Sequence, residues 1–309
     1  MSGSSKGIVV YDRAGIKRVI SREKYRDSVL PLAFSDHWND ADGLYGVLLY
    51  SLQDGFFAES LSAAEHLCEI DPSLRAAMAY ANALLKCERP ADAERFIDAA
   101  LSRYGDDATL LTHLASAYAY QGRDEAVEPI LWRALRADPN DEHALKWLEV
   151  LRRERGGDAA SRAVVSEIAS LPGSWLAQLF MARWLLAERK FDDAAALYDL
   201  AIERAGKPVP ADLLMQMSGD LGNAGRSAEA IARVEPLYDV AVHGPMRGGF
   251  STGYNLMQSH VDVGDFDGAD RIIQSMYALK RPDWRETLDL HFASLVEARK
   301  RSGEDQSAG

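Results

Sequence analysis

A repeat of 34 residues is the feature that most constrains the fold of this chain. Ala81 recurs as Ala115, and Ala100 recurs as Ala134, in each case 34 residues later. Other apolar residues follow the same offset: Leu84 with Tyr118, Ala93 with Val127, Ile97 with Leu131, and Leu101 with Leu135. A fixed period of this length is typical of solenoids, in which each unit contacts only its neighbours.

Within each repeat, the pattern predicts a helical hairpin. Apolar residues recur at three- and four-residue spacing for about a dozen residues, stop at a turn, and resume for about another dozen. Small residues such as Ala115 and Ala134 let the two helices approach closely. One hairpin leaves an apolar face uncovered, so several copies must stack to bury it. The length of 309 residues therefore reflects the number of repeats more than the number of domains.

One copy closely resembles the tetratricopeptide repeat. It has residues of that family's pattern at Leu111, Leu114, Ala115, Tyr118, Gly122, Leu131, Ala134 and Pro139, with Val127 in place of the usual alanine. Two further copies are clear, at 74–107 and 175–208, and degenerate copies lie at 41–73, 142–174, 211–244 and 250–283. The resemblance implies an all-α, right-handed superhelical solenoid of about seven hairpins over residues 41–283.

The spacing lengthens in the second half of the chain. Ala194 and Ala230 are 36 residues apart, and Ala230 and Ala269 are 39 apart. The additional residues fall in two segments rich in glycine and proline, 206–210 and 242–249. We expect the segment 242–249 to be a hinge or a functional loop.

Residues 1–40 do not follow the repeat. β-Branched residues at 8–11 and 16–20 flank a turn-like segment at 12–15, which predicts a small β-hairpin. A lone hairpin is marginally stable, so docking on the first helices is favoured over pairing with another copy or a partner and over staying flexible. Ser21 is expected to cap a helix over 22–34 that is kinked at Pro31.

The other end of the repeats predicts a capping helix at 284–301, followed by a flexible tail at 302–309. Asp283 and Glu286 have the spacing of a capping box. Trp284, Leu288 and Phe292 form an apolar stripe that can cover the last repeat.

The charge balance argues against several classes of partner. The chain has 47 acidic and 35 basic residues and a net charge of −12, which repels nucleic acids and anionic membranes. Cys68 and Cys87 form no CxxC pair, so neither a disulfide framework nor a zinc site is predicted. No signal peptide or membrane span is recognisable, and a cytoplasmic location is expected.

Motifs of catalysis are not evident. The sequence has no phosphate-binding loop, dinucleotide fingerprint, HExxH or GxSxG motif. The acidic segment 262–270 resembles a calcium loop, but Val263 and Gln274 occupy two positions that require carboxylates. The histidines show no helical pairing suited to a metal. We therefore expect no catalytic residue, metal or cofactor.

The resemblance places a partner-binding groove along the first helices of the hairpins. Carried over onto this sequence, it implies a groove that includes Met78, Asn82, Lys86, Thr112, Ser116 and Leu179. Within that groove, we expect the partner to be held around His113, Tyr120, His143, Lys146, Trp147, Phe180 and Arg183. The repeat's packing pattern does not account for Trp147 and Phe180, and exposed aromatic residues are common interface anchors. The alternative for Trp147 is burial between the helices of a degenerate repeat.

These observations favour a non-catalytic scaffold or adaptor that binds a peptide or a segment of another protein. The second hypothesis is a regulator that closes on a peptide or small molecule and changes a partner's activity. An enzyme with an active site assembled from distant residues is the third. Self-association through the N-terminal hairpin is also compatible with the sequence.

Overall fold

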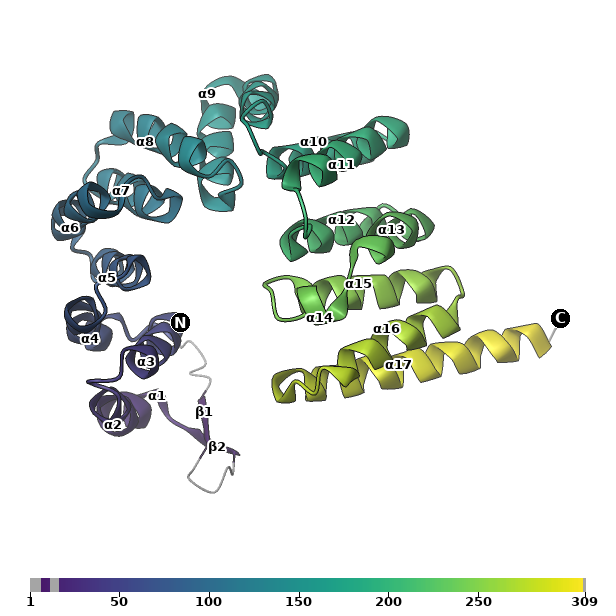
Figure 1. Cartoon of the computed structure of the whole chain (residues 1–309), viewed down its shortest axis with the longest axis horizontal. Helices are drawn as coiled ribbons and strands as arrows, with labels where there is room; N and C mark the ends of the chain where they lie inside the picture. Colours follow the sequence, from purple (N-terminus) through teal and green to yellow (C-terminus); the bar gives the residue numbers. More distant parts are fainter. Residues whose placement is uncertain (1–6, 12–16, 308–309) are drawn as a thin grey trace, which may run out of the picture. The chain divides into compact units, whose positions relative to one another are not determined.

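Pairs of helices joined by short turns account for most of the structure (Figure 1). The structure is a computed structural model that describes residues 7–11 and 17–307. Its contacts divide the chain into two units, Met1–Leu151 and Arg152–Gly309. The predicted all-α repeat solenoid is confirmed by the successive hairpins within these units.

The first unit contains three complete hairpins and the beginning of a fourth. They are α3 (Ala41–Gln53) with α4 (Phe57–Ile70), α5 (Leu74–Lys86) with α6 (Pro90–Tyr104), α7 (Ala108–Tyr120) with α8 (Asp124–Ala137), and the start of α9 (Glu142–Ala169). The first helices α3, α5 and α7 contact one another in succession, and the second helices α4 and α6 pack against the first helices that follow them, α5 and α7. The first helices therefore form a continuous layer.

Alanines occupy the places where these helices cross. Ala81, Ala93, Ala115 and Ala134 have at most 1% of their surface exposed. The large apolar residues of the same repeats, Leu84, Ile97 and Leu131, fill the space around them and are equally buried. The register inferred from the 34-residue offset is therefore the register of the core.

Replacing Ala115 with leucine should lower the stability of the first unit. Ala115 is completely buried in α7, which packs against α5, α6 and α8, so the added side chain has no room. Overpacking of this kind costs about 1–3 kcal/mol. Thermal unfolding followed by circular dichroism measures the loss. Ala58→Leu, at an exposed site of α4, is the matched control, and equal melting temperatures for the two variants would contradict the register.

The turns inside the hairpins share a left-handed backbone conformation. Gly55, Gly122, Gly225 and Gly264 have φ between 69° and 81°. Glu88 and Arg189 occupy the corresponding turns of two other hairpins with φ of 57° and 59°. Glycine adopts this conformation without steric cost, whereas other residues usually avoid it. The turn geometry is thus kept even where the glycine is absent.

The predicted N-terminal hairpin is present. β1 (Ile8–Tyr11) and β2 (Lys17–Ile20) are antiparallel, with Ile8 opposite Ile20, while the expected turn at 12–15 lies outside the described residues. Ile8 packs against the core formed around Leu30 and Leu44, as docking requires. Val9 and Val19 lie opposite each other and are 46% and 66% exposed. Pairing with a second copy stays a prediction.

The helix after the hairpin differs from the expected kinked α-helix. Ser21 caps it as predicted, because its Oγ accepts the N–H of Lys24 at 3.2 Å. After α1 (Arg22–Lys24) the chain forms a π-helical turn over Tyr25–Val29, and then α2 (Leu30–Asp36). The N–H of Leu30 donates to the carbonyl of Tyr25, five residues back. The wider turn precedes Pro31, which has no N–H to donate.

The second unit continues the same architecture. Its helices are the later part of α9, which is interrupted at Gly156 and Gly157, then α10 (Leu176–Ala187), α11 (Phe191–Ala205), α12 (Ala211–Asn223), α13 (Ser227–Val234), α14 (Val240–His243), α15 (Gly249–Asp262), α16 (Phe266–Ala278) and α17 (Pro282–Ser307). A 3₁₀ turn at Glu235–Leu237 follows α13.

The segment 242–249 is closely packed, which argues against the expected hinge. His243 is buried, and its Nε2 lies 3.1 Å from the carbonyl oxygen of Val209. A Cβ added to Gly249 would lie 1.9 Å from the carbonyl oxygen of His243. The glycine therefore allows two backbone segments to come together. Gly249 is needed here for this close approach, and not for freedom of the backbone to move.

A second histidine of this unit, His260, joins three elements. It is 2% exposed near the end of α15. Its Nδ1 lies 2.8 Å from Oδ2 of Asp265, which caps α16, and its Nε2 lies 3.0 Å from Oε2 of Glu235 in the 3₁₀ turn. The imidazole thus connects α15 to the elements on either side.

The last helix covers the final hairpin. Trp284, Leu288 and Leu295 of α17 are buried, and α17 packs against α16. The proposed capping box is wrong, because α17 already begins at Pro282 and the Asp283 carboxylate accepts from the Arg281 guanidinium at 2.8 and 2.9 Å. Proline is favoured in the first turn of a helix. The helix continues to Ser307, beyond the end expected at 301, and 308–309 lie outside the described residues.

Candidate functional site

A polar pocket of about 480 Å³ lies on the first unit between α7 and the start of α9. One helical face of α7 contributes Thr109, Thr112, His113 and Ser116, and one face of α9 contributes His143, Lys146, Trp147 and Val150, with Asp141 just before it. Residues at spacings of three and four share a helix face, so each helix presents one stripe to the pocket. Both are first helices of their hairpins.

Two hydroxyl groups of α7 that line the pocket, those of Thr112 and Ser116, donate their hydrogens to the helix backbone. Thr112 Oγ1 donates to the carbonyl of Thr109 at 2.8 Å, and Ser116 Oγ donates to the carbonyl of Thr112 at 3.0 Å. A hydroxyl has one hydrogen and two lone pairs. Since the hydrogens are used within the helix, the lone pairs are what these groups can offer to a ligand.

His113 is held in its neutral form. Burial, with a smaller contribution from the nearby His143, lowers its pKa to about 4. Its Nδ1 is buried and has no hydrogen-bond partner among the residues that the structure describes. A buried polar atom without a partner costs roughly 1–3 kcal/mol. The imidazole would therefore gain from a ligand that completes its hydrogen bonding.

Stability should depend on pH through His113. An unfolded imidazole takes up a proton near 6.5, whereas folded His113 does so only near 4. Between these values the unfolded state binds more protons, so the unfolding free energy falls as the pH falls, by up to about 3 kcal/mol. Urea unfolding of the wild type and of His113→Gln across this range measures the difference. The same pH dependence in both proteins would assign the effect to other groups.

On the α9 side, Asp141 caps the helix. Its Oδ1 accepts the N–H of Ala144 at 2.7 Å. Burial raises the pKa of Asp141, and the nearby carboxylates of Asp138 and Asp107 raise it further. The capping N–H of Ala144 and the side chain of His143 act in the opposite direction. The ammonium group of Lys146 lies 2.6 Å from Oε1 of Glu142, which balances its charge. The pocket therefore has a carboxylate in a partly dehydrated setting.

The structure brings four of the seven predicted residues together. His113, His143, Lys146 and Trp147 all line the pocket. Trp147 is half-buried. Burial between the helices, the alternative considered above, therefore applies to only part of its side chain. Tyr120 is 66% exposed at the end of α7 but does not line the pocket.

The other two predicted residues belong to the second unit. The guanidinium of Arg183 lies over the ring of Phe180 at 5.1 Å from its centroid. Arg183 also pairs with Asp220 at 2.8 Å and donates to Gln216 at 2.5 Å. Burial raises the pKa of Asp220 to about 6 even though the guanidinium acts in the opposite direction. Arg183 thus already connects α10 to α12, and a role in partner binding stays a prediction.

Thr109, Asp141 and Val150 were not among the predicted groove residues. Thr109 lies four residues before His113, a helical spacing that could have indicated a shared face. Asp141 directly precedes a helix, which predicts a capping role and gives no sign of a site. Its place in the pocket depends on how α9 packs beside α7.

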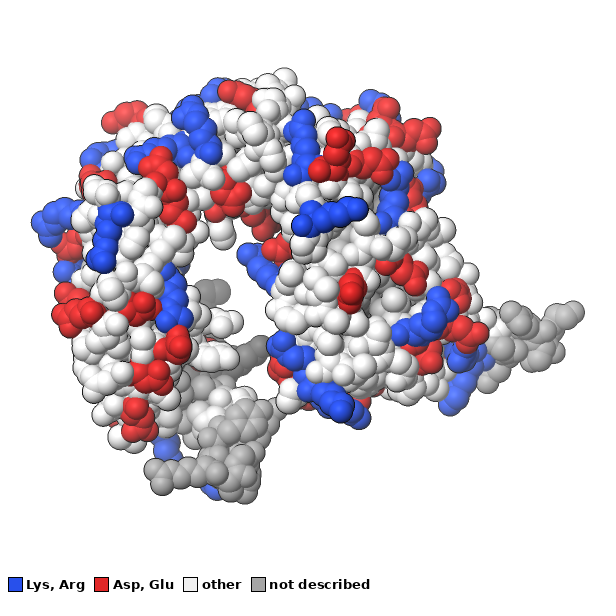
Figure 2. All heavy atoms as spheres, viewed as in Figure 1, with Lys and Arg blue, Asp and Glu red and all other residues white. Residues whose placement is uncertain are grey.

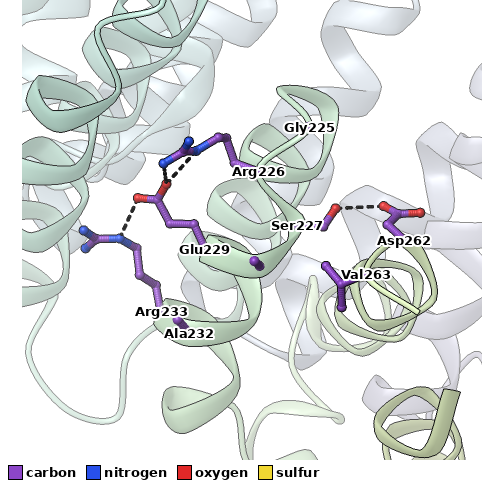
Figure 3. A pocket seen from close by; sticks show the side chains of 9 residues that line it. Gly225, Arg226, Ser227, Glu229, Ala232, Arg233, Asp262 and Val263 are labelled. Carbon is purple, nitrogen blue, oxygen red and sulfur yellow. Dashed lines mark hydrogen bonds and ion pairs between the residues drawn. The ribbon is translucent and has the colours of Figure 1, made fainter. Parts of the chain in front are cut away.

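A larger cavity, of about 910 Å³, lies on the second unit beside the start of α13 and the end of α15 (Figure 3). Its charged side chains pair with one another. Glu229 accepts from Arg226 at 3.0 Å and from Arg233 at 2.9 Å, and Ser227 Oγ donates to Asp262 at 2.8 Å (Figure 3). These pairs leave little unmet hydrogen-bonding capacity, and we regard the pocket beside Trp147 as the stronger candidate.

The wider surface has mixed charge. On the face shown in Figure 2, basic and acidic side chains are interspersed, which gives no broad field of one sign there. The described part of the chain contains no group of three or more His, Cys, Asp or Glu side chains placed to hold a metal ion. Within residues 7–11 and 17–307, no helix has the length and apolar character that crossing a membrane requires.

Comparison with known proteins identifies the fold. No protein-family model and no curated protein matches the sequence. Among solved structures, yeast Tom70 matches 88% of this chain at 16% identity and a TM-score of 0.52, and this chain spans only 58% of that one. A tetratricopeptide repeat protein from Parabacteroides merdae matches 84% of this chain and 98% of its own, at 14% identity and a TM-score of 0.37.

A third structure, the tetratricopeptide-repeat protein YrrB, matches 58% of this chain and 93% of its own, at 16% identity and a TM-score of 0.35. At 16% identity, the similarity to Tom70 concerns the fold and not the activity. The stacked hairpins, the buried alanines in register and the similarity to Tom70 agree with one another. The chain therefore has the tetratricopeptide-repeat fold.

Proposed function

We propose that this chain is a non-catalytic scaffold or adaptor that binds a segment of another protein along the first helices of its first unit. The observation that carries the proposal is the pocket beside Trp147. There a half-buried indole, two histidines and several polar groups face a cavity open to solvent. Partly exposed aromatic side chains with polar neighbours are common anchors of protein interfaces.

The layout of the surface favours an extended ligand over a compact one. The pocket is formed by side chains on two helices of a continuous layer, and Tyr120 lies exposed farther along α7. Lys86 of the adjacent helix α5 is near enough to His113 to contribute to lowering its pKa. A peptide that crosses α5, α7 and α9 would contact all of these groups, whereas a small molecule would contact only part of them.

Site-specific photocrosslinking in the native cell tests this proposal. A photoreactive amino acid at Ser116, inside the pocket, is expected to capture a distinct partner protein. The same amino acid at Asp124, exposed on α8, is the matched control. Capture from Asp124 alone, or equal capture of the same proteins from both sites, would exclude the pocket as the binding surface.

A further inference from the structure

We propose that the pocket between α7 and α9 receives a basic side chain, arginine or lysine, of the bound segment. The inference rests on the proposed function and names the chemistry that the site selects. Three properties of the pocket lead to it: an excess of hydrogen-bond acceptors, a partly buried carboxylate, and an indole that lines the same pocket.

The acceptors come mainly from α7. The hydroxyls of Thr112 and Ser116 have given their hydrogens to backbone carbonyls, so only lone pairs remain for a ligand. Neutral His113 has one acceptor nitrogen, and rotation about its Cβ–Cγ bond exchanges the position of Nδ1 with that of a ring carbon. A ligand rich in N–H groups would satisfy these atoms together. The ammonium of lysine and the guanidinium of arginine only donate.

The charges near the pocket favour a cation. Asp141 uses one lone pair for the N–H of Ala144, and a carboxylate has roughly four such sites. Asp107 and Asp138 are close enough to raise its pKa further. Among the cations, Lys146 is paired with Glu142, and Lys86 on α5 lies near His113. His143 lowers the pKa of Asp141, but the two carboxylates Asp107 and Asp138 act in the opposite direction. A bound cation would offset the cost of keeping the Asp141 carboxylate away from water.

Trp147 suits the same ligand. A cation over an indole face is attracted by the ring's electrons, most strongly where water is partly excluded. Val150, one turn farther along α9, is exposed and can contact the apolar stem of a lysine or arginine side chain. The pocket thus offers contacts for both the head and the stem of a basic residue.

An anionic ligand fits poorly. A carboxylate or phosphate needs donors, but the hydroxyl hydrogens of Thr112 and Ser116 are committed and the Lys146 ammonium is shared with Glu142. It would also approach the carboxylate of Asp141. Like charges in a partly buried site repel strongly.

Selection of displayed peptides on the full chain tests the inference. Random dodecapeptides are selected on the wild type, and peptides that also bind Trp147→Ala are removed. We expect the remaining peptides to share arginine or lysine at one position. Peptides that need Trp147 but share no basic residue would overturn the inference and leave the proposed function standing. Failure to obtain any Trp147-dependent peptide would overturn both.

A second measurement uses a selected peptide with a matched pair of variants. Asp141→Asn removes the charge and keeps a good capping residue. We expect it to weaken binding roughly tenfold, as loss of a charge-assisted contact does. Asp124→Asn, at an exposed site of α8, is the control and should bind like the wild type. Replacing the peptide's basic residue with neutral citrulline or norleucine should cause a similar loss. Unchanged affinity in Asp141→Asn would refute the role of the carboxylate.

Discussion

Replacing Trp147 with alanine is expected to weaken binding of the protein segment by about thirtyfold or more. Truncating an aromatic anchor often costs about 2 kcal/mol, which corresponds to that factor. The half-buried indole lies beside the pocket, where a partner can cover the rest of its surface. Fluorescence polarisation with a labelled peptide selected on the wild type measures the loss.

Trp132→Ala is the matched control for this experiment. Trp132 is also half-buried and belongs to the same unit, but it lies on α8 and does not line the pocket. Both variants lose an indole and should retain helical circular dichroism spectra. A loss of affinity in Trp132→Ala as large as in Trp147→Ala would move the binding surface to the second helices or point to an indirect effect on the fold.

Replacing His260 with alanine is expected to lower the unfolding free energy by about 3 kcal/mol. His260 is buried, and each of its ring nitrogens lies within hydrogen-bonding distance of a carboxylate oxygen, one from Asp265 and one from Glu235. Truncation to alanine removes both of these hydrogen bonds, each of which contributes about 1 kcal/mol. It would also leave a cavity where Gly268 packs closely on the imidazole.

Chemical denaturation followed by circular dichroism tests the role of His260. His37→Ala is a suitable control, since His37 also contacts a carboxylate, Asp40, at 3.3 Å, but on the surface. Exposed ion pairs contribute little, so His37→Ala should stay within about 0.5 kcal/mol of the wild type. Similar small losses for both variants would show that the buried contacts of His260 contribute no more than exposed ones.

The repeat could be predicted because it depends on local spacing. The buried alanines at 81, 93, 115 and 134 and the large residues around them recur at one offset. The same register led from the family's groove positions to His113, His143, Lys146 and Trp147, which the structure brings to one pocket. A pattern that repeats along the chain reports which face of each helix a residue occupies.

Other features depend on contacts that no local pattern encodes. Gly249 and His243 lie in a segment that reads as a loop, yet His243 reaches the carbonyl of Val209, 34 residues earlier. The sequence predicts only a helix-capping role for Asp141. Its place in the pocket depends on α9 lying beside α7. Where a site is formed by two helices that meet in space, local patterns predict each helix but do not predict their contact.

The left-handed turns have a consequence for how such a chain can change over evolutionary time. Glu88 and Arg189 adopt the backbone conformation that glycine adopts in the turns at Gly55, Gly122 and Gly225. The turns at Glu88, Gly122 and Arg189 close with the same two backbone hydrogen bonds, at 2.8 to 3.0 Å, whether or not the residue is glycine. Individual repeats can therefore drift away from their ancestral signature while the stack, and any binding surface along it, keeps its geometry.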